Sequence, residues 1–400
     1  MTSAASVSTL PPPSEVELAH SRRVAQHIRE FMAARGGVIG FDTWMRLALY
    51  APGLGYYSAG ATKLGADGDF ITAPEVSSLF SRCVARQAAE VLEATGGDIL
   101  ELGAGSGRMA ADVLTELAAL DRLPARYRIL EVSADLRERQ RSRLASLPPS
   151  LASRIEWLDR WPEDAMNGVI LANEVLDAMP VERFVLRGAA GAQQVRALAV
   201  ALEGEEFRWR EIEASPELDH AVRDILGSLP EPLPDGYVSE VCLALQPWMA
   251  SLAAQLERGV ALLFDYGLSR TQLYHPDRSD GTLRCHYRHR AHGDPFLNVG
   301  LQDITAWVDF TSVADAADSS GLDVLGYATQ SAFLIGAGIE SLLTSETKDA
   351  AQDPRRMARL SGEARKLMLP GEMGEVFKVI ALGRGHDSPL RGFRMGLREL

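Results

Sequence analysis

The chain has 400 residues, of which 46% are hydrophobic and 24% charged, and its formal net charge at pH 7 is −13. This composition is typical of a soluble globular protein, and no apolar run reaches the roughly 18 residues of a membrane-spanning helix, so no membrane partner is expected. The acidic excess argues against a nucleic-acid partner, because phosphates attract clustered lysine and arginine, and it favours a cationic one. The length predicts one large domain with insertions, or two domains.

The cysteines and the first residues of the chain indicate its compartment. Cys83, Cys242 and Cys285 are far apart and odd in number, which gives neither a disulfide framework nor a zinc pattern. Residues 1–15 predict a flexible leader, without the features of a secretory or mitochondrial signal. We therefore expect a protein of the reducing cytoplasm.

Residues 16–95 are expected to form a helical N-terminal extension. Apolar residues at helical spacing predict helices over residues 16–34, 41–49 and 76–94. The glycine-rich stretch 53–75 is too irregular for a long element. We interpret it as a loop that covers a ligand site, with a plain surface connection as the alternative.

The most informative segment is an apolar strand at residues 99–102, which is followed by Gly103, Gly105 and Gly107. These glycines lack the Cβ atoms that would keep a ligand away from the backbone. A helix over residues 108–120 is expected next, so its unpaired N–H groups would point toward the ligand. The dinucleotide fingerprint G-x-G-x-x-G would need a glycine at position 108, which is an arginine.

Polar side chains close the strands that follow. One strand ends at Glu131, at about the separation from the glycine turn where ribose-binding carboxylates are expected, although a solvated strand-end residue is the alternative. The next two strands are followed by Asp159, which can accept from an adenine amino group, and by Asn173. The carboxyl ends of parallel strands meet at one edge, so these side chains are expected to face a common ligand. The predicted strands are 99–102, 127–132, 155–158, 169–172, 260–267 and 377–382.

Strands that alternate with helices predict an α/β fold, with a Rossmann-like, mostly parallel sheet covered by helices on both faces. The last strand, 377–382, is expected to pair antiparallel at the sheet edge. Residues 184–213 alternate apolar and polar positions around glycines, which predicts antiparallel hairpins. The expected division is therefore a core over 96–180 and 259–385, an inserted substrate-side subdomain of hairpins and helices over 181–258, and a tail over 386–400.

Five motifs stand in order along the chain: GDFITAPEVS at 68–77, ELGAGSG at 101–107, NEVLDAMPV at 173–181, DYG at 265–267 and MGE at 373–375. Together they resemble the MidA family, which contains the mitochondrial complex I assembly methyltransferase and its bacterial relatives. The match runs from about residue 36 to residue 382. The resemblance implies a class I methyltransferase fold with a helical N-terminal extension, and protein arginine methylation in the mitochondrial member. The excess of arginine over lysine looks bacterial.

The expected cofactor is S-adenosylmethionine. The E-x-G-x-G-x-G signature that begins at Glu101 is the usual first motif of methyltransferases that use it, and a carboxylate there can hold the cofactor's ammonium group. The motifs and the strand ends together give the expected cofactor-binding residues: Gly68, Asp69, Thr72, Glu101, Gly103, Gly105, Gly107, Glu131, Asp159 and Asn173.

Glu174 and Asp177 are the expected catalytic residues. If the acceptor is an arginine, its charged guanidinium must be held by carboxylates, and these two would lie on one face if the segment is a helical turn. A carboxylate that stabilises a helix start is the alternative for Asp177. Asp265 and Tyr266, which end the fifth core strand, are expected to line the acceptor pocket.

Other functions stay open at this point. The chain could bind the cofactor as an assembly factor without turnover, methylate a small molecule, or use a nicotinamide cofactor. His286, His289 and His292 lack the further ligands of a recognisable metal site, so no metal is expected. The expected partner is a protein acceptor, with a subunit of a respiratory complex as one candidate, and a homodimer stays open.

Overall fold

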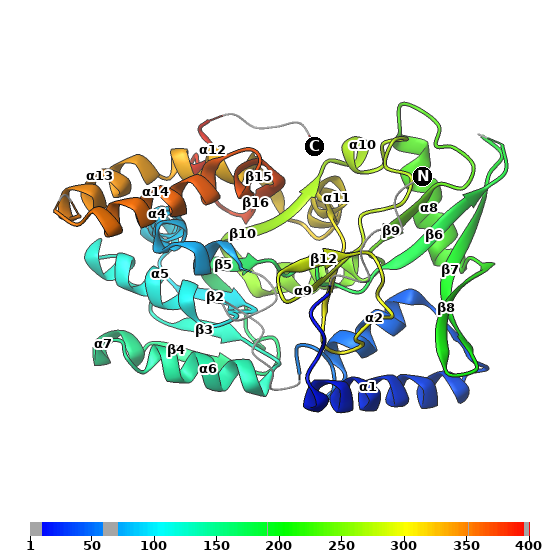
Figure 1. The fold of residues 1–400 in the computed structure, drawn as a ribbon. Coiled ribbons are helices and arrows are strands. Elements are labelled where there is room, and N and C mark those ends of the chain that lie inside the picture. The colour runs from blue at the N-terminus through cyan, green and yellow to red at the C-terminus, as the bar shows by residue number, and fades with distance from the viewer. Residues whose placement is uncertain (1–9, 59–70, 190, 351, 396–399) are drawn as a thin grey trace. The chain divides into compact units, whose positions relative to one another are not determined.

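The computed structural model describes residues 10–58, 71–189, 191–350, 352–395 and 400 (Figure 1). The chain divides into two compact units. Two segments differ from the expected division. The helix expected over 76–94 belongs to the same unit as the methyltransferase-like sheet, and residues 269–309 belong to the same unit as the N-terminal helices. Unit 1 is Met1–Phe70, Leu176–Leu245 and Ser269–Asp309, and unit 2 is Ile71–Val175, Gln246–Leu268 and Phe310–Leu400.

Seven strands of unit 2 belong to one sheet, which has one topological switch. Its neighbouring strands follow the order β15-β16-β10-β5-β2-β3-β4, which is 3-2-1-4-5-7-6 when read from β4 and numbered along the chain within the unit. All pairs from β10 to β4 are parallel. The order reverses between β2 and β5, so a ligand crevice is expected at the carboxyl ends of these two strands. The strands are β2 (Asp98–Leu102), β3 (Tyr127–Leu130), β4 (Ile155–Leu158), β5 (Met166–Asn173), β10 (Leu256–Leu268), β15 (Asp323–Thr329) and β16 (Phe377–Arg384).

The last strand confirms one expectation and corrects another. β16 pairs antiparallel with β10, as expected, with Leu263 opposite Ile380. It does not lie at the sheet edge, because β15 pairs with its other side. The sequence reading missed β15, whose pairing register shifts between Val324 and Gly326. An added Cβ on Gly326 would lie 2.4 Å from the ring of Phe393, so close packing explains the glycine that interrupts the strand.

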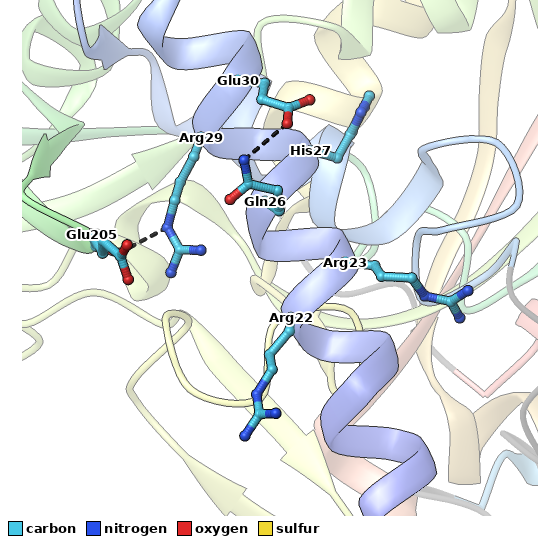
Figure 2. Close-up of a pocket in the computed structure, with 7 residues that line it drawn as sticks. All are labelled: Arg22, Arg23, Gln26, His27, Arg29, Glu30 and Glu205. Carbon is cyan, nitrogen blue, oxygen red and sulfur yellow. Dashed lines mark hydrogen bonds between the residues drawn. The ribbon is translucent and has the colours of Figure 1, made fainter.

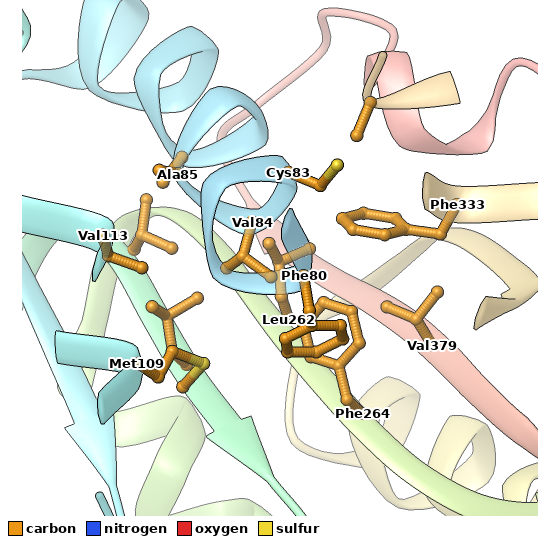
Figure 3. Packing of buried hydrophobic residues seen from close by; sticks show 14 of the residues in the cluster. Phe80, Cys83, Val84, Ala85, Met109, Val113, Leu262, Phe264, Phe333 and Val379 are labelled. Atoms are coloured by element: carbon orange, nitrogen blue, oxygen red, sulfur yellow. The ribbon is translucent and has the colours of Figure 1, made fainter. Parts of the chain in front are cut away.

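An apolar core joins the helices of unit 2 to the sheet. Phe80 of α4 packs edge-on against Phe264 of β10, with ring centroids 5.2 Å apart, and Phe333 of α12 packs against the same ring at 5.1 Å (Figure 3). Each of these side chains is no more than 1% exposed, so the core fixes the strands whose ends carry the site. The helices are α3 (Ala73–Val76), α4 (Ser78–Thr95), α5 (Arg108–Ala119), α6 (Ala134–Leu144), α7 (Pro149–Ala152), α9 (Leu245–Gln255), α11 (Phe310–Ser319), α12 (Gln330–Gly336), α13 (Ile339–Asp349), α14 (Pro354–Met368), α15 (Met373–Val376) and η2 (Arg391–Phe393).

Unit 1 combines helices with small antiparallel sheets. Its first helix, α1, begins at a capping box formed by Ser14 and Glu17. The hairpins expected over 184–213 are present, because β7 pairs antiparallel with both β6 and β8. A second sheet has the order β12-β11-β13. The elements are α1 (Glu15–Ala33), β1 (Val38–Ile39), α2 (Phe41–Tyr50), β6 (Glu182–Arg187), β7 (Gln194–Glu203), β8 (Glu206–Glu213), α8 (Pro216–Ser228), β9 (Val238–Val241), α10 (Arg270–Leu273), β11 (Arg284–Tyr287), β12 (Arg290–His292), β13 (Asp303–Thr305) and β14 (Val308–Asp309).

No helix in the described part of the chain combines the length and the apolar character needed to cross a membrane.

A pair of carboxyl groups in unit 1 makes its stability depend on pH. Burial and the neighbouring carboxyl of Asp42 raise the pKa of Glu182 to about 8. The folded state therefore holds a proton that the unfolded state loses near pH 4.5, and the free energy of unfolding must fall as pH rises from about 4.5 to 8. We expect Glu182→Gln, which mimics the protonated acid, to raise Tm at pH 8.5 by about 2–4 °C, and to change it little at pH 5.

Thermal melts from pH 5 to 9 measure this effect. Glu231→Gln is the matched control, since Glu231 is exposed in the same unit. Parallel Tm curves for the wild type and Glu182→Gln across this range would contradict the assignment.

Candidate functional site

A glycine turn joins β2 to α5 at the switch point of the sheet. All five residues of β2 are buried, and Gly103, Gly105 and Gly107 have φ values of 63°, 53° and 78°. The turn is tied to the sheet because Gly103 N–H donates to the Leu130 carbonyl at 3.1 Å. Gly107 caps α5 without any side-chain hydrogen bond, so the first N–H groups of this helix face the turn and can bind a ligand. The sequence predicted this strand, turn and helix.

Glu131 follows β3 and is held in a defined orientation. Its Oε1 accepts from Ser133 N–H at 2.9 Å, and its Oε2 accepts from Gln140 Nε2 at 2.9 Å. The same Gln140 amide donates to the Gly105 carbonyl at 3.0 Å and accepts from Trp157 Nε1 at 3.1 Å. A single glutamine thus links the carboxylate to the glycine turn.

Glu101 is buried within the sheet. It is 1% exposed, and its Oε2 accepts from Tyr127 Oη at 2.7 Å. Burial raises the pKa of Glu101 to about 7, while the tyrosine bond opposes the shift and the charge of Glu131 adds to it. The structure therefore places Glu101 within the sheet, with Tyr127 as a partner that the sequence reading missed. A direct contact with the cofactor's ammonium group stays a prediction.

The end of β5 presents two polar residues. Asn173 donates from Nδ2 to Glu174 Oε1 at 3.1 Å, while its buried Oδ1 has no hydrogen-bond partner among the described residues. Glu174 has φ of 55°, an uncommon conformation for a residue with a side chain, and its N–H donates to the Phe264 carbonyl at 2.8 Å. A buried acceptor without a partner and a strained backbone are both typical of a ligand site.

The expected pocket residues at the end of β10 lie on the sheet. Asp265 is fully buried and accepts from Tyr266 N–H at 2.9 Å. In the strand register it lies opposite Lys378 of β16, which is 5% exposed. The ring of Tyr266 packs edge-on against Phe377, with centroids 5.4 Å apart. That Asp265 and Tyr266 line an acceptor pocket stays a prediction.

The remaining expected cofactor residues differ in placement. Asp159 is exposed directly after β4, and Thr72 precedes the short helix α3. Gly68 and Asp69 lie outside the described residues. Val132, which follows Glu131, is 74% exposed.

Asp177 belongs to unit 1, and the expected helical turn with Glu174 does not form. Residues 174–180 contain only bends and a turn, and the left-handed backbone of Glu174 prevents a helix there. Asp177 is 4% exposed and lies near Tyr57, whose Oη donates to Asp303 at 2.8 Å. Asp303, Tyr57 and Tyr50 were not singled out by the sequence reading, because they come from segments far apart in the chain.

A pocket of unit 1 lies along α1 (Figure 2). It is lined by three arginines of α1 together with Gln26, His27, Glu30 and Glu205, the last from the turn between β7 and β8. Arg29 Nε donates to the Glu205 carbonyl at 2.9 Å, and Gln26 donates to Glu30 at 2.8 Å. No group of three or more potential metal ligands was found among the described residues. The charges of this hollow are mixed, and it contains none of the expected site residues.

Comparison with known proteins points to one chemistry. A family model described as "Putative S-adenosyl-L-methionine-dependent methyltransferase" matches residues 83–328. The structure resembles a crystal structure of a Burkholderia thailandensis protein bound to S-adenosyl-homocysteine, with 40% sequence identity and a TM-score of 0.90 over 98% of this chain and 99% of that one. A second crystal structure, of an uncharacterized protein from the same organism, gives 40% identity and a TM-score of 0.88 over the same shares.

Curated relatives are more distant. The chain is 29% identical over 377 residues to the mitochondrial protein arginine methyltransferase NDUFAF7 homolog of Drosophila melanogaster, covering 87% of this chain and 82% of the relative. It is 28% identical over 405 residues to protein arginine methyltransferase NDUFAF7 of Mus musculus, covering 92% of this chain and 86% of the relative.

Proposed function

Because this chain belongs to that family of S-adenosylmethionine-dependent methyltransferases, we propose that it transfers the methyl group to an arginine side chain of a protein. Membership fixes the cofactor and the reaction class, and it sets the nicotinamide alternative aside. The observation that carries the proposal is the site at the ends of β2, β3 and β5. A glycine turn, an oriented carboxylate and a buried amide oxygen meet there at the switch of strand order.

The residues of unit 2 fit the cofactor. The turn of Gly103, Gly105 and Gly107 lets the backbone approach the methionine portion, and Glu131 can accept from both ribose hydroxyls. The Oδ1 of Asn173, which has no hydrogen-bond partner in the described part of the chain, suits a donor such as the cofactor's ammonium group. The bound cofactor supplies an electrophilic methyl group on a sulfonium. The protein's contribution is then to hold the acceptor nitrogen in line, which can supply about 7–11 kcal/mol of the barrier reduction.

The arginine acceptor is supported by charge and by the relatives. The net charge of −13 favours a cationic acceptor. The curated relatives named above are called protein arginine methyltransferases. Glu174 and Asp177 are the proposed holders of the guanidinium, with Asp265 and Tyr266 lining the acceptor pocket. A subunit of a respiratory complex is one candidate acceptor protein.

We place the enzyme in the bacterial cytoplasm as part of the same proposal. The two solved relatives at 40% identity are bacterial proteins. The two mitochondrial relatives named above are 29% and 28% identical.

The test is methyl transfer from labelled S-adenosylmethionine into the proteins of a bacterial extract by the purified full chain, followed by acid hydrolysis. We expect the label in methylarginine. Label confined to small molecules would contradict the protein acceptor and favour the small-molecule alternative. Binding of S-adenosylhomocysteine with no transfer would favour the alternative of an assembly factor without turnover.

A further inference from the structure

Helix α6 of unit 2 carries one polar residue on its buried face. Its buried residues are Leu136, Gln140 and Leu144, which are spaced four apart and therefore lie along one side of the helix. Gln140 is fully buried. Burying an amide costs free energy unless its donors and its acceptor are paired, and a third leucine at this position would carry no such cost. The hydrogen bonds of Gln140, rather than its packing, therefore explain why a glutamine stands there.

The amide of Gln140 bonds to residues at three neighbouring strands. Its Nε2 donates to Glu131 Oε2, just after β3, at 2.9 Å and to the Gly105 carbonyl, in the turn after β2, at 3.0 Å. Its Oε1 accepts from Nε1 of Trp157, which belongs to β4, at 3.1 Å. Both N–H groups and the oxygen of the amide are thus in use, so one side chain connects all three places.

Trp157 determines which way the amide points. An indole N–H can only donate, so the atom that faces it must be the amide oxygen. The NH₂ group of Gln140 must then face the Glu131 carboxylate and the Gly105 carbonyl. A flipped amide would set its oxygen against the carboxylate, with two acceptors facing each other and no proton between them. The tryptophan therefore fixes the glutamine, and the glutamine in turn fixes the carboxylate.

The start of α6 holds the same carboxylate from its other side. Ser133 N–H donates to Glu131 Oε1 at 2.9 Å, and Ser133 also caps α6, because its Oγ accepts from Leu136 N–H at 3.3 Å. The helix packs closely on the glycine turn as well, since an added Cβ on Gly107 would lie 3.3 Å from Cα of Gln140. A displacement of α6 would therefore move the carboxylate and disturb the turn together.

We infer that Gln140 is a positioning residue for the cofactor: it holds the Glu131 carboxylate and the glycine turn in the arrangement that binds S-adenosylmethionine, and Trp157 holds Gln140. An amide is suited to this role because it offers two donors and an acceptor in one plane. A glutamate lacks the two N–H donors, and a methionine lacks all three groups. The inference rests on the cofactor site given under the proposed function, and it does not depend on the methyl acceptor.

The test is titration of the full chain with S-adenosylhomocysteine at pH 5.5 and pH 8.5, for the wild type and Gln140→Glu. The substitution keeps the side-chain shape but sets a second carboxyl against Glu131. At low pH the two acids can share a proton, so the introduced group still donates to Glu131, whereas at high pH two negative charges face each other. We expect Kd to exceed that of the wild type about fivefold at pH 5.5 and at least about 50-fold at pH 8.5.

The readout is the ratio of the two dissociation constants at each pH, because other groups near this amide titrate or carry charge in both proteins. Burial raises the pKa of Glu101 to about 7, within the range of the experiment. Arg137 Nη2 donates to the Glu131 carbonyl at 2.6 Å, and the guanidinium of Arg141 lies 5.5 Å from the centre of the Trp157 ring. The neighbouring groups are Glu101 of β2, Tyr127 of β3, and Arg137 and Arg141 of α6.

A second buried glutamine of unit 2 gives the matched control. Gln87 is fully buried, its Nε2 donates to Glu90 at 3.0 Å, and its Oε1 accepts from Gly392 N–H at 2.9 Å. Gln87→Glu therefore also sets a carboxyl against a glutamate, in a part of the unit that contains none of the site residues. We expect it to lower Tm and to leave the ratio of dissociation constants near one at both pH values.

Two further variants separate positioning from a structural role. The double variant Glu131→Gln with Gln140→Glu exchanges the amide and the acid, so it has a single charge and should lose the pH dependence. Gln140→Met keeps the length of the side chain and adds no charge, and it should bind about tenfold more weakly at both pH values.

Three results would overturn the inference: wild-type affinity in Gln140→Met, the same ratio for Gln140→Glu at both pH values, or a pH dependence that persists in the double variant. These binding measurements are independent of the labelled-methyl assay. If that assay puts no label into methylarginine, the acceptor proposal fails while the affinities expected here are unchanged.

Discussion

Replacing Gly103 with valine is expected to weaken S-adenosylhomocysteine binding at least about 100-fold and to abolish methyl transfer. At φ of 63° a β-branched residue is strained, by about 1–2 kcal/mol. An added Cβ would lie 3.4 Å from Cγ2 of Val175, so the two further methyl groups of valine have no free space on that side. They would displace the turn or occupy the place of the ligand, and a shift of about 1 Å in such a site can cost about 100-fold.

The control for this variant is a glycine with the same φ. Gly96, which ends α4, also has φ of 63°, and an added Cβ there has no neighbour within 4 Å. Gly96→Val should therefore also strain the backbone, at a positive φ, and still bind the ligand normally. Calorimetric titration of both variants with S-adenosylhomocysteine gives the comparison. Similar affinities for Gly103→Val and Gly96→Val would refute the assignment of the glycine turn.

Replacing Glu131 with alanine is expected to raise the Kd for S-adenosylhomocysteine about 100-fold. The carboxylate is held by Ser133 N–H and Gln140 Nε2, so it can accept both ribose hydroxyls without losing side-chain freedom on binding. Hydrogen bonds to a charged group contribute about 1.5–3 kcal/mol each, and each 1.4 kcal/mol is tenfold in affinity. Glu131→Gln, which keeps the shape but not the charge, should lose about tenfold.

A ligand lacking the 2′-hydroxyl makes this prediction specific. If Glu131 binds the ribose, the wild type must lose affinity when the hydroxyl is removed, and Glu131→Ala must be insensitive to the same change. Glu138→Gln is the control, because Glu138 is exposed on α6 with 72% of its side chain accessible. Equal losses in the wild type and Glu131→Ala would mean that the carboxylate does not contact the sugar.

The parts of the fold that the sequence predicted are those with strong local signals. The strand before the glycine turn, the turn itself and the helix after it form within about 20 consecutive residues, and their apolar spacing is regular. The hairpins after residue 184 likewise show alternating polarity. β15 was missed because Gly326 interrupts its pattern, and the cause of that glycine is the ring of Phe393, far away in the chain.

The same contrast holds for the candidate site. The positions of Glu131 and Asn173 at neighbouring strand ends were predicted because the ends of parallel strands must meet at one edge of the sheet. The helical turn that would put Glu174 and Asp177 on one face does not form, and spacing alone does not reveal the left-handed backbone of Glu174. The pairing of Tyr57 with Asp303 spans 246 residues of chain, and no local pattern marks such a contact.

If Glu174 holds the acceptor as proposed, its conformation sets stability against function at one position. Glycine would adopt this φ without strain, so an engineer who selects only for thermal resistance would tend to replace the glutamate. The more thermostable variant obtained in this way would lack the carboxylate that follows β5. Mutant libraries that are screened for stability should therefore keep residue 174 unchanged.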